Sequence, residues 1–181
     1  MKTLVLGLLM LGVSLGSSHH TSTEGFMTQE NINERDHVIE AVTALFVKTD
    51  IRDWQGVKAV LADQVLLDYT SLAGGAPAEM TPDEIVSGWQ QVLPGFEHTH
   101  HAISNFQIQI EGDKATVKHY GTADHYLPND EGGSLWVVVG TYDHQLKKVQ
   151  GKWRIEQLTF NLKFIDGNND LPRLAQEKVQ Q

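Results

Sequence analysis

Acid–base chemistry is the reaction type that the polar residues of this sequence favour. Nine histidines occur among the 181 residues, and His101 and His125 are the candidates for moving a proton. Asp50 could hold one imidazole in a single tautomer and raise its basicity, and the hydroxyl of Tyr69 could donate to an oxygen that gains negative charge. Their spacing does not by itself place Asp50 beside His101, because a carboxylate at that position is also typical of a helix end.

Metal binding is the second chemistry that the histidines suggest. His98, Thr99 and His100 follow Gly95 and resemble the start of a cupin metal motif. That motif needs a glutamate a few residues further on, whereas the next acidic residue is Glu111. It also belongs to all-β chains, and this chain begins with helical patterns. We therefore expect no metal site and no other cofactor.

The elements that must position these residues follow from the hydrophobic period. The period is near 3.6 in the first half of the chain, which predicts helices, and it changes to 2 after Gly95, which predicts strands. Thr81 and Glu84 form the sequence signature of a capping box, with Pro82 in the first turn. The predicted helices are 29–48, 53–62, 82–92 and a short one after Pro172, and the predicted strands are 65–69, 99–111, 114–126, 135–147 and 152–164, with a loop at 71–80.

Helices followed by a meander of strands predict an α+β fold, in which an antiparallel sheet has helices on one side. Strands of this length must bend, and a bent sheet closed by helices leaves a cavity, which is a natural ligand site. His119 and His125 are an even number of residues apart, so they share one face of a strand. Since that face is otherwise small and apolar, each histidine on it needs a polar partner.

The N-terminus predicts export. Lys2 precedes an uncharged apolar run from Leu4 to Leu15, and small residues follow the run. The run is shorter than the roughly 20 residues that a membrane-spanning helix needs. We therefore expect a periplasmic or secreted protein with no membrane span after signal removal, built from a signal peptide (1–18), a flexible leader (19–27) and one domain (28–181).

Charge and cysteine content exclude other classes of protein. The formal net charge is −9 at pH 7, and an acidic surface repels the phosphate backbone of nucleic acids. The sequence has no cysteine, so disulfides and thiol chemistry are ruled out. The expected partner is a small, largely apolar molecule.

Four stretches of the sequence carry a family resemblance: TDIRDW at 49–54 with VLLDYTSL at 65–72, THHAI at 99–103, KHY at 118–120 leading to Asp124-His125, and GKWRI at 151–155. In this order and spacing they resemble scytalone dehydratase and the wider SnoaL-like group of the nuclear transport factor 2-like superfamily, over most of residues 30 to 168. The resemblance implies a cone-shaped fold, a curved mixed sheet wrapped around N-terminal helices that encloses a pocket.

The same resemblance implies a set of site residues. It makes Asp50, His101 and His125 catalytic and Tyr69 one of two pocket tyrosines. The Asp–His pair is also similar to the dyad of hexachlorocyclohexane dehydrochlorinase and of bile-acid dehydratases. The residues expected to contact the substrate are Thr49, Trp54, His119, Tyr142 and Phe160.

The chain departs from scytalone dehydratase where that enzyme contacts its substrate. The second tyrosine of the enzyme falls on Thr49, and its serine and asparagine fall on Gly140 and Tyr142. The Asp–His machinery is thus kept while the substrate contacts differ. We therefore do not assign scytalone as the substrate, and the predicted export argues against it as well.

Strand alternation and the resemblance disagree about the histidine doublet. Strict alternation puts His101 on the same face as the polar residues Asn105 and Gln107, whereas the resemblance requires His101 to face the pocket. A β-bulge between Ile103 and Phe106 would reconcile the two, since bulges are common beside active sites. Without a bulge, His100 would be the inward residue.

Three functions remain open from the sequence. The first is a cofactor-independent, dehydratase-like lyase or isomerase that uses the Asp–His pair as general base on a small carbonyl or hydroxy compound. The second is a non-catalytic exported protein that binds a small apolar ligand. The third, compatible with both, is an oligomerisation module, with homodimer and homotrimer left open, whose contact patch would consist of Tyr120, Tyr126, Val137 and Val139.

Overall fold

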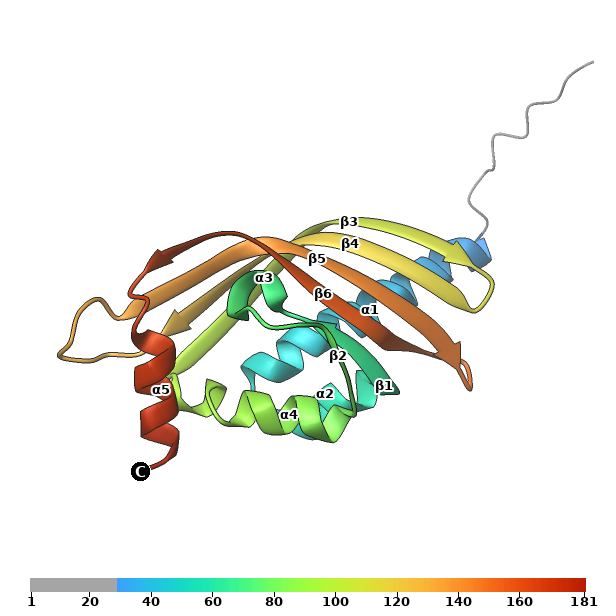
Figure 1. The fold of residues 1–181 in the computed structure, drawn as a ribbon. Coiled ribbons are helices and arrows are strands. Elements are labelled where there is room, and N and C mark those ends of the chain that lie inside the picture. The colour runs from blue at the N-terminus through green and yellow to red at the C-terminus, as the bar shows by residue number, and fades with distance from the viewer. Residues whose placement is uncertain (1–28) are drawn as a thin grey trace, which may run out of the picture.

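The computed structural model describes residues 29–181, and in it a curved sheet arches over the helices (Figure 1). The predicted signal peptide and leader lie outside the described residues, so export stays a prediction. In chain order the elements are α1 (Gln29–Asp50), α2 (Trp54–Val60), β1 (Leu61–Asp68), α3 (Thr70–Ala73), β2 (Ala78–Met80), α4 (Pro82–Gln90), the 3₁₀ helix η1 (Leu93–Gly95), β3 (His98–Glu111), β4 (Lys114–Tyr126), β5 (Leu135–Val149), β6 (Lys152–Gly167) and α5 (Leu171–Val179).

The sheet has six strands in the order β2-β1-β6-β5-β4-β3. The pair β1–β6 is parallel, and the other four pairs are antiparallel. After β2 the chain crosses to β3 at the opposite edge of the sheet, and the four long strands then return as a meander that ends with β6 beside β1. This arrangement confirms the predicted α+β fold with a curved, mostly antiparallel sheet.

Helix α1 is held against the inner face of the sheet by one apolar stripe. Val38, Val42, Leu45 and Phe46 recur at helical spacing and are all buried. Burying a side chain of this size contributes roughly 1.5–3 kcal/mol, which is more than any single residue adds through helix propensity. The position of α1, and of the functional groups at its C-terminal end, is thus fixed by packing on the sheet.

Local capping signals set the starts of helices α2 and α4. In α4, Thr81 Oγ1 accepts from the backbone N–H of Glu84 at 3.3 Å, and Glu84 Oε2 accepts from the backbone N–H of Thr81 at 2.8 Å. This is the predicted capping box. In α2, the Asp53 carboxylate accepts from the backbone N–H of Gly56 at 2.9 Å, as an N-cap does.

Long-range pairing explains where the sequence prediction is wrong. Helix α2 ends at Val60 rather than at residue 62, because Leu61 already pairs in parallel with Ile155 of β6. The predicted loop 71–80 contains the short helix α3 and strand β2, which pairs with β1. These pairings join residues far apart in the chain, so the local glycine-rich composition did not reveal them.

The bulge expected in β3 is present. The register of β3 on β4 shifts between Ser104 and Gln107, and Asn105 has a φ of 60°. His101 therefore points to the inner face on one side of the shift, while Phe106 points inward on the other side and His100 is exposed. A second shift lies between β5 and β6, where Val139 pairs with Phe164 and Gly140 pairs with Leu162, and Phe164 beyond this shift is exposed.

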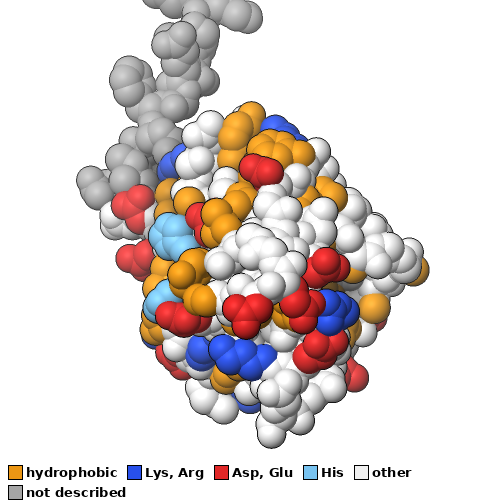
Figure 2. Space-filling model, turned by 90° about the vertical axis from the view of Figure 1, so that its left-hand side faces the viewer, with side chains coloured by type: hydrophobic (Ala, Val, Ile, Leu, Met, Phe, Trp, Pro, Cys, Tyr) orange, Lys and Arg blue, Asp and Glu red, His pale blue; other side chains and the backbone are white. Residues whose placement is uncertain are grey.

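Helix α5 covers one end of the molecule. Leu171 and Ala175 are fully buried against Phe96 and Leu127. The contact with η1 is so close that a Cβ atom on Gly95 would lie 1.9 Å from the carbonyl oxygen of Ala175. Figure 2 shows this end of the molecule, where hydrophobic side chains lie among acidic and histidine side chains.

Two of the four patch residues expected on the outer sheet face are well exposed, Tyr120 at 50% and Tyr126 at 40%. Val137 and Val139 are less exposed than the two tyrosines, being half-buried. Whether this patch joins copies of the chain stays a prediction. Among residues 29–181, no helix is long and apolar enough to cross a bilayer.

Candidate active site

A cavity of about 340 Å³ lies between the inner face of the sheet and the helices. Every long strand and the helices α1, α3, α4 and α5 contribute to its wall. The wall is mainly apolar and rich in aromatic rings, among them Phe46, Trp89, Phe96, Trp136 and Phe160. Its polar side chains are few, namely Thr49, Tyr69, His101, His125 and Tyr142.

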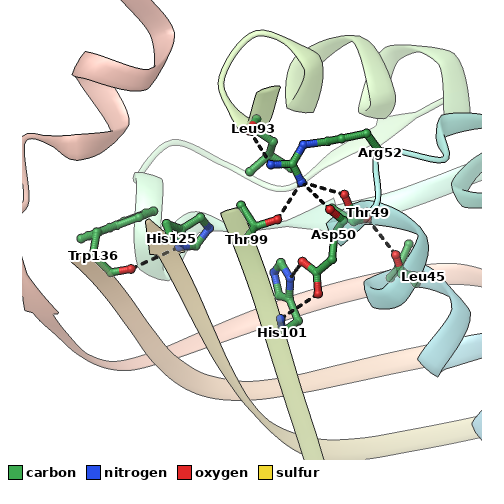
Figure 3. A network of polar contacts seen from close by, with 9 residues as sticks. All are labelled: Leu45, Thr49, Asp50, Arg52, Leu93, Thr99, His101, His125 and Trp136. Carbon is green, nitrogen blue, oxygen red and sulfur yellow. Dashed lines mark hydrogen bonds and ion pairs between the residues drawn. The ribbon is translucent and has the colours of Figure 1, made fainter. Parts of the chain in front are cut away.

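Asp50 and His101 form a hydrogen-bonded pair (Figure 3), in which His101 lines the cavity and Asp50 lies behind it. Asp50 is the last residue of α1, and one carboxylate oxygen lies 2.7 Å from Nδ1 of His101. The other carboxylate oxygen accepts the backbone N–H of His101 at 2.8 Å. The carboxylate thus holds both the ring and the backbone of His101, which fixes the ring relative to β3.

The charge of Asp50 determines the tautomer of His101. Burial by itself raises the pKa of the Asp50 carboxyl, but the hydrogen bonds from the ring and the backbone N–H of His101 act in the opposite direction, and the pKa is lowered overall. An ionised carboxylate only accepts, so Nδ1 of His101 carries the proton and donates. The remaining nitrogen, Nε2, then has a lone pair, and the imidazole can act as a base on a molecule in the cavity.

His125 lies beside this pair but is held differently. Its ring centroid is 6.1 Å from that of His101, and Nδ1 lies 3.3 Å from the carbonyl oxygen of Trp136. A carbonyl only accepts, so Nδ1 is the protonated nitrogen. Burial, with a smaller effect from His101, lowers the pKa of His125 to about 4, so this imidazole is neutral at pH 7.

Two tyrosine hydroxyls complete the polar part of the wall. Burial raises the pKa of both Tyr69 and Tyr142, so both remain hydrogen-bond donors. Gly121 makes room for Tyr142, since a Cβ atom there would lie 2.5 Å from the tyrosine ring. A Cβ atom on Gly140 would lie equally close to the ring of Phe160, so the space beside Gly140 is filled by an aromatic ring.

Two residues expected to contact substrate do not line the cavity. Trp54 is part of α2 and packs against the main hydrophobic core. His119 is 1% exposed, and its Nε2 lies 2.9 Å from Nε2 of His144 in that core. Neither side chain therefore lies at the cavity: strand alternation gave the inward direction of His119 but not its distance from the cavity, and Trp54 points from α2 into the core.

Thr49, Tyr142 and Phe160 do line the cavity, as do Tyr69, His101 and His125. Thr49 donates its hydroxyl to the carbonyl oxygen of Leu45 at 2.7 Å, so this donor is already used within α1. The roles of these residues toward a substrate stay predictions.

The sequence analysis missed the residues that surround the Asp50–His101 pair. Arg52 reaches from the end of α1 to Thr99 on β3 and to the backbone of Leu93. A cation directly after a helix end was the available signal, because cations favour helix C-termini. Phe96 and Trp136 were also missed, since no period connects them to the other wall residues.

The placement of the His, Asp and Glu side chains bears on metal binding. Within residues 29–181, no group of three or more His, Asp or Glu side chains is placed to hold a metal ion. His98 and His100, which suggested the cupin motif, are both exposed.

Comparison with known proteins gives one family and many related structures. A family model described as a SnoaL-like domain matches residues 30–159. No protein of curated function matches the sequence. Among solved structures, the Kfla4162 protein from Kribbella flavida is 25% identical, with a TM-score of 0.74 and 78% of this chain and 98% of that chain covered.

Two more distant structures share the fold. A candidate scytalone dehydratase from Novosphingobium aromaticivorans is 18% identical, with a TM-score of 0.66 and coverage of 79% of this chain and 93% of that one. A hexachlorocyclohexane dehydrochlorinase from Novosphingobium barchaimii is 11% identical, with a TM-score of 0.65 and coverage of 77% and 93%. At these identities the likeness concerns the fold alone.

Proposed function

The chain belongs to the SnoaL-like family, as its motifs predict, and we propose that it is a cofactor-independent, dehydratase-like lyase or isomerase. Its substrate is a small, largely apolar carbonyl or hydroxy compound. One observation carries the proposal: the hydrogen bond between Asp50 and Nδ1 of His101 leaves Nε2 of that ring available to a molecule in an apolar cavity.

The first step is removal of a proton. Nε2 of His101 takes a proton from the carbon next to a carbonyl group, and the electron pair of the broken C–H bond moves toward the carbonyl oxygen. The carboxylate of Asp50, with one oxygen 2.7 Å from Nδ1 of His101, stabilises the imidazolium that forms. Positioned general-base catalysis of this kind contributes about 10²–10⁴-fold to the rate.

The second requirement is a donor to the oxygen that gains charge. Tyr69 and Tyr142 both line the cavity, and burial keeps their hydroxyls protonated by raising their pKa. A hydroxyl in such an apolar site stabilises a developing enolate more strongly than it would in water.

The last step, for a dehydratase, is loss of hydroxide as water. The C–O bond breaks, a C=C bond forms, and the proton held by His101 is returned to the leaving hydroxyl. The sequence suggested His125 as the donor in this step. Its hydrogen bond to the Trp136 carbonyl and its lowered pKa of about 4 favour a different role: neutral His125 accepts a hydrogen bond from the substrate hydroxyl and orients it.

The test begins with a panel of neutral hydroxy ketones, monitored for loss of water by mass spectrometry and for the conjugated C=C bond by absorbance. With a substrate in hand, Asp50→Asn and His101→Gln are expected to lower kcat by about 10²–10⁴-fold. His100→Gln is the matched control, because it changes the exposed neighbour on the same strand and should leave kcat unchanged. Wild-type turnover in both dyad variants would end the proposal.

A non-catalytic binding protein is the second candidate. The observation that favours it is the mainly apolar wall, in which the hydroxyl of Thr49, at the position of the missing tyrosine, is already used within α1. Native mass spectrometry of the purified protein would reveal a retained ligand. A retained ligand that is chemically unchanged after incubation, together with no turnover across the panel, would favour this candidate over the lyase.

A further inference from the structure

The end of helix α1 has an arginine where helices usually have glycine. The backbone N–H of Asp53 donates to the carbonyl of Lys48 at 2.9 Å, and that of Arg52 donates to the carbonyl of Thr49 at 3.1 Å. These two bonds define a Schellman end, whose C′ residue takes a left-handed conformation. Arg52 has this conformation, with a φ of 60°.

A left-handed conformation is unfavourable for a residue with a Cβ atom, and such residues collect at functional sites. Glycine would satisfy the backbone here at no such cost. The reason for an arginine must therefore lie in its side chain.

The guanidinium group of Arg52 joins three segments of the chain (Figure 3). Nη1 lies 2.6 Å from Oγ1 of Thr99 on β3, and 2.9 and 3.1 Å from the carbonyl oxygens of Thr49 and Asp50 at the end of α1. Nη2 lies 2.6 Å from the carbonyl oxygen of Leu93 in η1. The planar, rigid fork of an arginine can serve several acceptors in this way, whereas a lysine ammonium cannot hold the same geometry.

The contacts of Arg52 join the same two elements, α1 and β3, as the contact between Asp50 and His101. Asp50 and Arg52 are two residues apart at the helix end, and Thr99 and His101 are two residues apart on one face of β3. Two connections therefore link α1 to β3, and each supports the other.

The positive charge of Arg52 also favours a carboxylate at this position of the helix. The C-terminal end of a helix carries partial negative charge, which disfavours a carboxylate, and Asp50 is the last residue of the 22-residue helix α1. A half-buried guanidinium beside the terminal carbonyl groups offsets that charge.

We propose that Arg52 is a positioning residue that holds the carboxylate of Asp50 against His101 by tying the end of α1 to β3 and η1. The inference rests on the proposed role of the Asp50–His101 pair. Arg52 does not line the cavity but a groove on the outer side of Asp50, so it acts through Asp50 and not on the substrate.

The test follows the proton that Asp50 and His101 share, by NMR of protein labelled with ¹⁵N-histidine. The Nδ1–H signal of His101 is identified by its absence in His101→Gln. In Arg52→Gly, where glycine suits the backbone, exchange of this proton with water should be at least about tenfold faster, since hydrogen bonds that hold the helix end are lost. Added guanidinium ion should slow the exchange again.

Lys48→Gln is the matched control. It removes a cation from the same helix end, one whose ammonium group pairs with Asp53 at 2.8 Å, and it should leave the signal unchanged. Thr99→Val is the second variant; it removes the β3 end of the connection and also the hydrogen bond between Thr99 and the Asp50 carboxylate, so faster exchange in this variant alone does not support the inference. Wild-type exchange in Arg52→Gly would overturn the inference.

Turnover separates this inference from the proposed function. With a substrate, Arg52→Gly should lower kcat by about tenfold and change KM by less than about threefold, because positioning affects the chemical step more than binding. If Asp50→Asn turns over normally while the NMR signal depends on Arg52, the lyase proposal fails and the positioning role stands. If Asp50→Asn is inactive and Arg52→Gly is wild type in both readouts, only the positioning role fails.

Discussion

Two pairs of polar side chains in this molecule have almost the same contact distance, but they differ in their surroundings. The Asp50–His101 contact is 2.7 Å, and the His119–His144 contact is 2.9 Å. The first pair contains a carboxylate and borders the cavity. The second, which we call the sealed pair, lies among aromatic rings of the core, including those of Phe46 and Tyr142.

The sealed pair has a defined proton arrangement. Nδ1 of His119 lies 3.0 Å from the carbonyl oxygen of Tyr120 and therefore donates to it. Nε2 of His119 must then accept the proton on Nε2 of His144. This leaves Nδ1 of His144 buried and, among the described residues, without a partner. The two pairs are thus similar in closeness but differ in two respects: only the Asp50–His101 pair has a carboxylate partner and a ring that lines the cavity.

Acidification should produce the largest effect that separates the two pairs. Burial lowers the pKa of His144 to about 3 and also lowers that of His119. The unfolded chain binds protons near the ordinary histidine pKa of about 6.5, so the stabilisation is complete above that pH and is lost as pH falls toward the folded pKa. From pH 7 to pH 5, His144 alone should lower the free energy of unfolding by about 2 kcal/mol.

Urea unfolding at pH 7 and pH 5 measures the total loss, to which His125, with its pKa lowered to about 4, also contributes. The carboxyl groups whose pKa values are lowered, such as Asp50 and Glu34, titrate below this window and do not contribute. The variant His119→Phe/His144→Leu should show a clearly smaller loss. Equal losses in wild type and variant would mean that the sealed pair is not neutral in the folded protein.

Replacing one histidine of the sealed pair should have the next largest effect, a loss of stability. His144→Leu removes the donor to Nε2 of His119, and leaving a buried group unsatisfied costs about 1–3 kcal/mol. The double variant His119→Phe/His144→Leu removes both partners and should be more stable than the single one. Thermal unfolding at pH 7 measures both.

Turnover distinguishes the sealed pair from the pair at the cavity. Neither sealed-pair variant should change turnover, whereas His101→Gln should abolish it with little change in stability. If His144→Leu reduced kcat as strongly as His101→Gln, the two pairs would have to be regarded as one network through Phe46.

Removal of one hydroxyl at the cavity should have the smallest effect. In Tyr69→Phe, Tyr142 can still donate to the substrate oxygen, so a decrease in kcat/KM of about tenfold is expected, the value of roughly one hydrogen bond. Stability should be unchanged, because the hydroxyl faces the cavity. A loss as large as that of His101→Gln would instead make Tyr69 the acid of the reaction.

The sequence predicted the parts of the fold that depend on local patterns. The periods of 3.6 and 2 and the capping box at Thr81 identified α1, α4 and β3 to β6 within a few residues. Strand β2 and the first part of β1 were missed, because both exist through pairing with residues distant in the chain.

The site was predictable only in part, for the same physical reason. Asp50 and His101 are 51 residues apart in the chain, and only the family resemblance placed them together. His119 was expected at the cavity because alternation gives a direction and not a depth. Arg52 was missed because its partners, Leu93 and Thr99, lie on other elements.

The shift at Asn105 divides β3 into two segments that alternate in opposite phase. The first segment contributes His101 to the cavity, and the second packs on the hydrophobic core through Phe106 and Ile108. Each can therefore change its pattern of inward residues without forcing a change in the other. Deleting one residue at Asn105 would bring the segments into phase and could turn His100 inward in place of His101. Because adjacent histidines occupy both phases, a slip of this strand by one residue would exchange one imidazole for another at the cavity, and the ring that shares a proton with Asp50 would report which phase the strand has adopted.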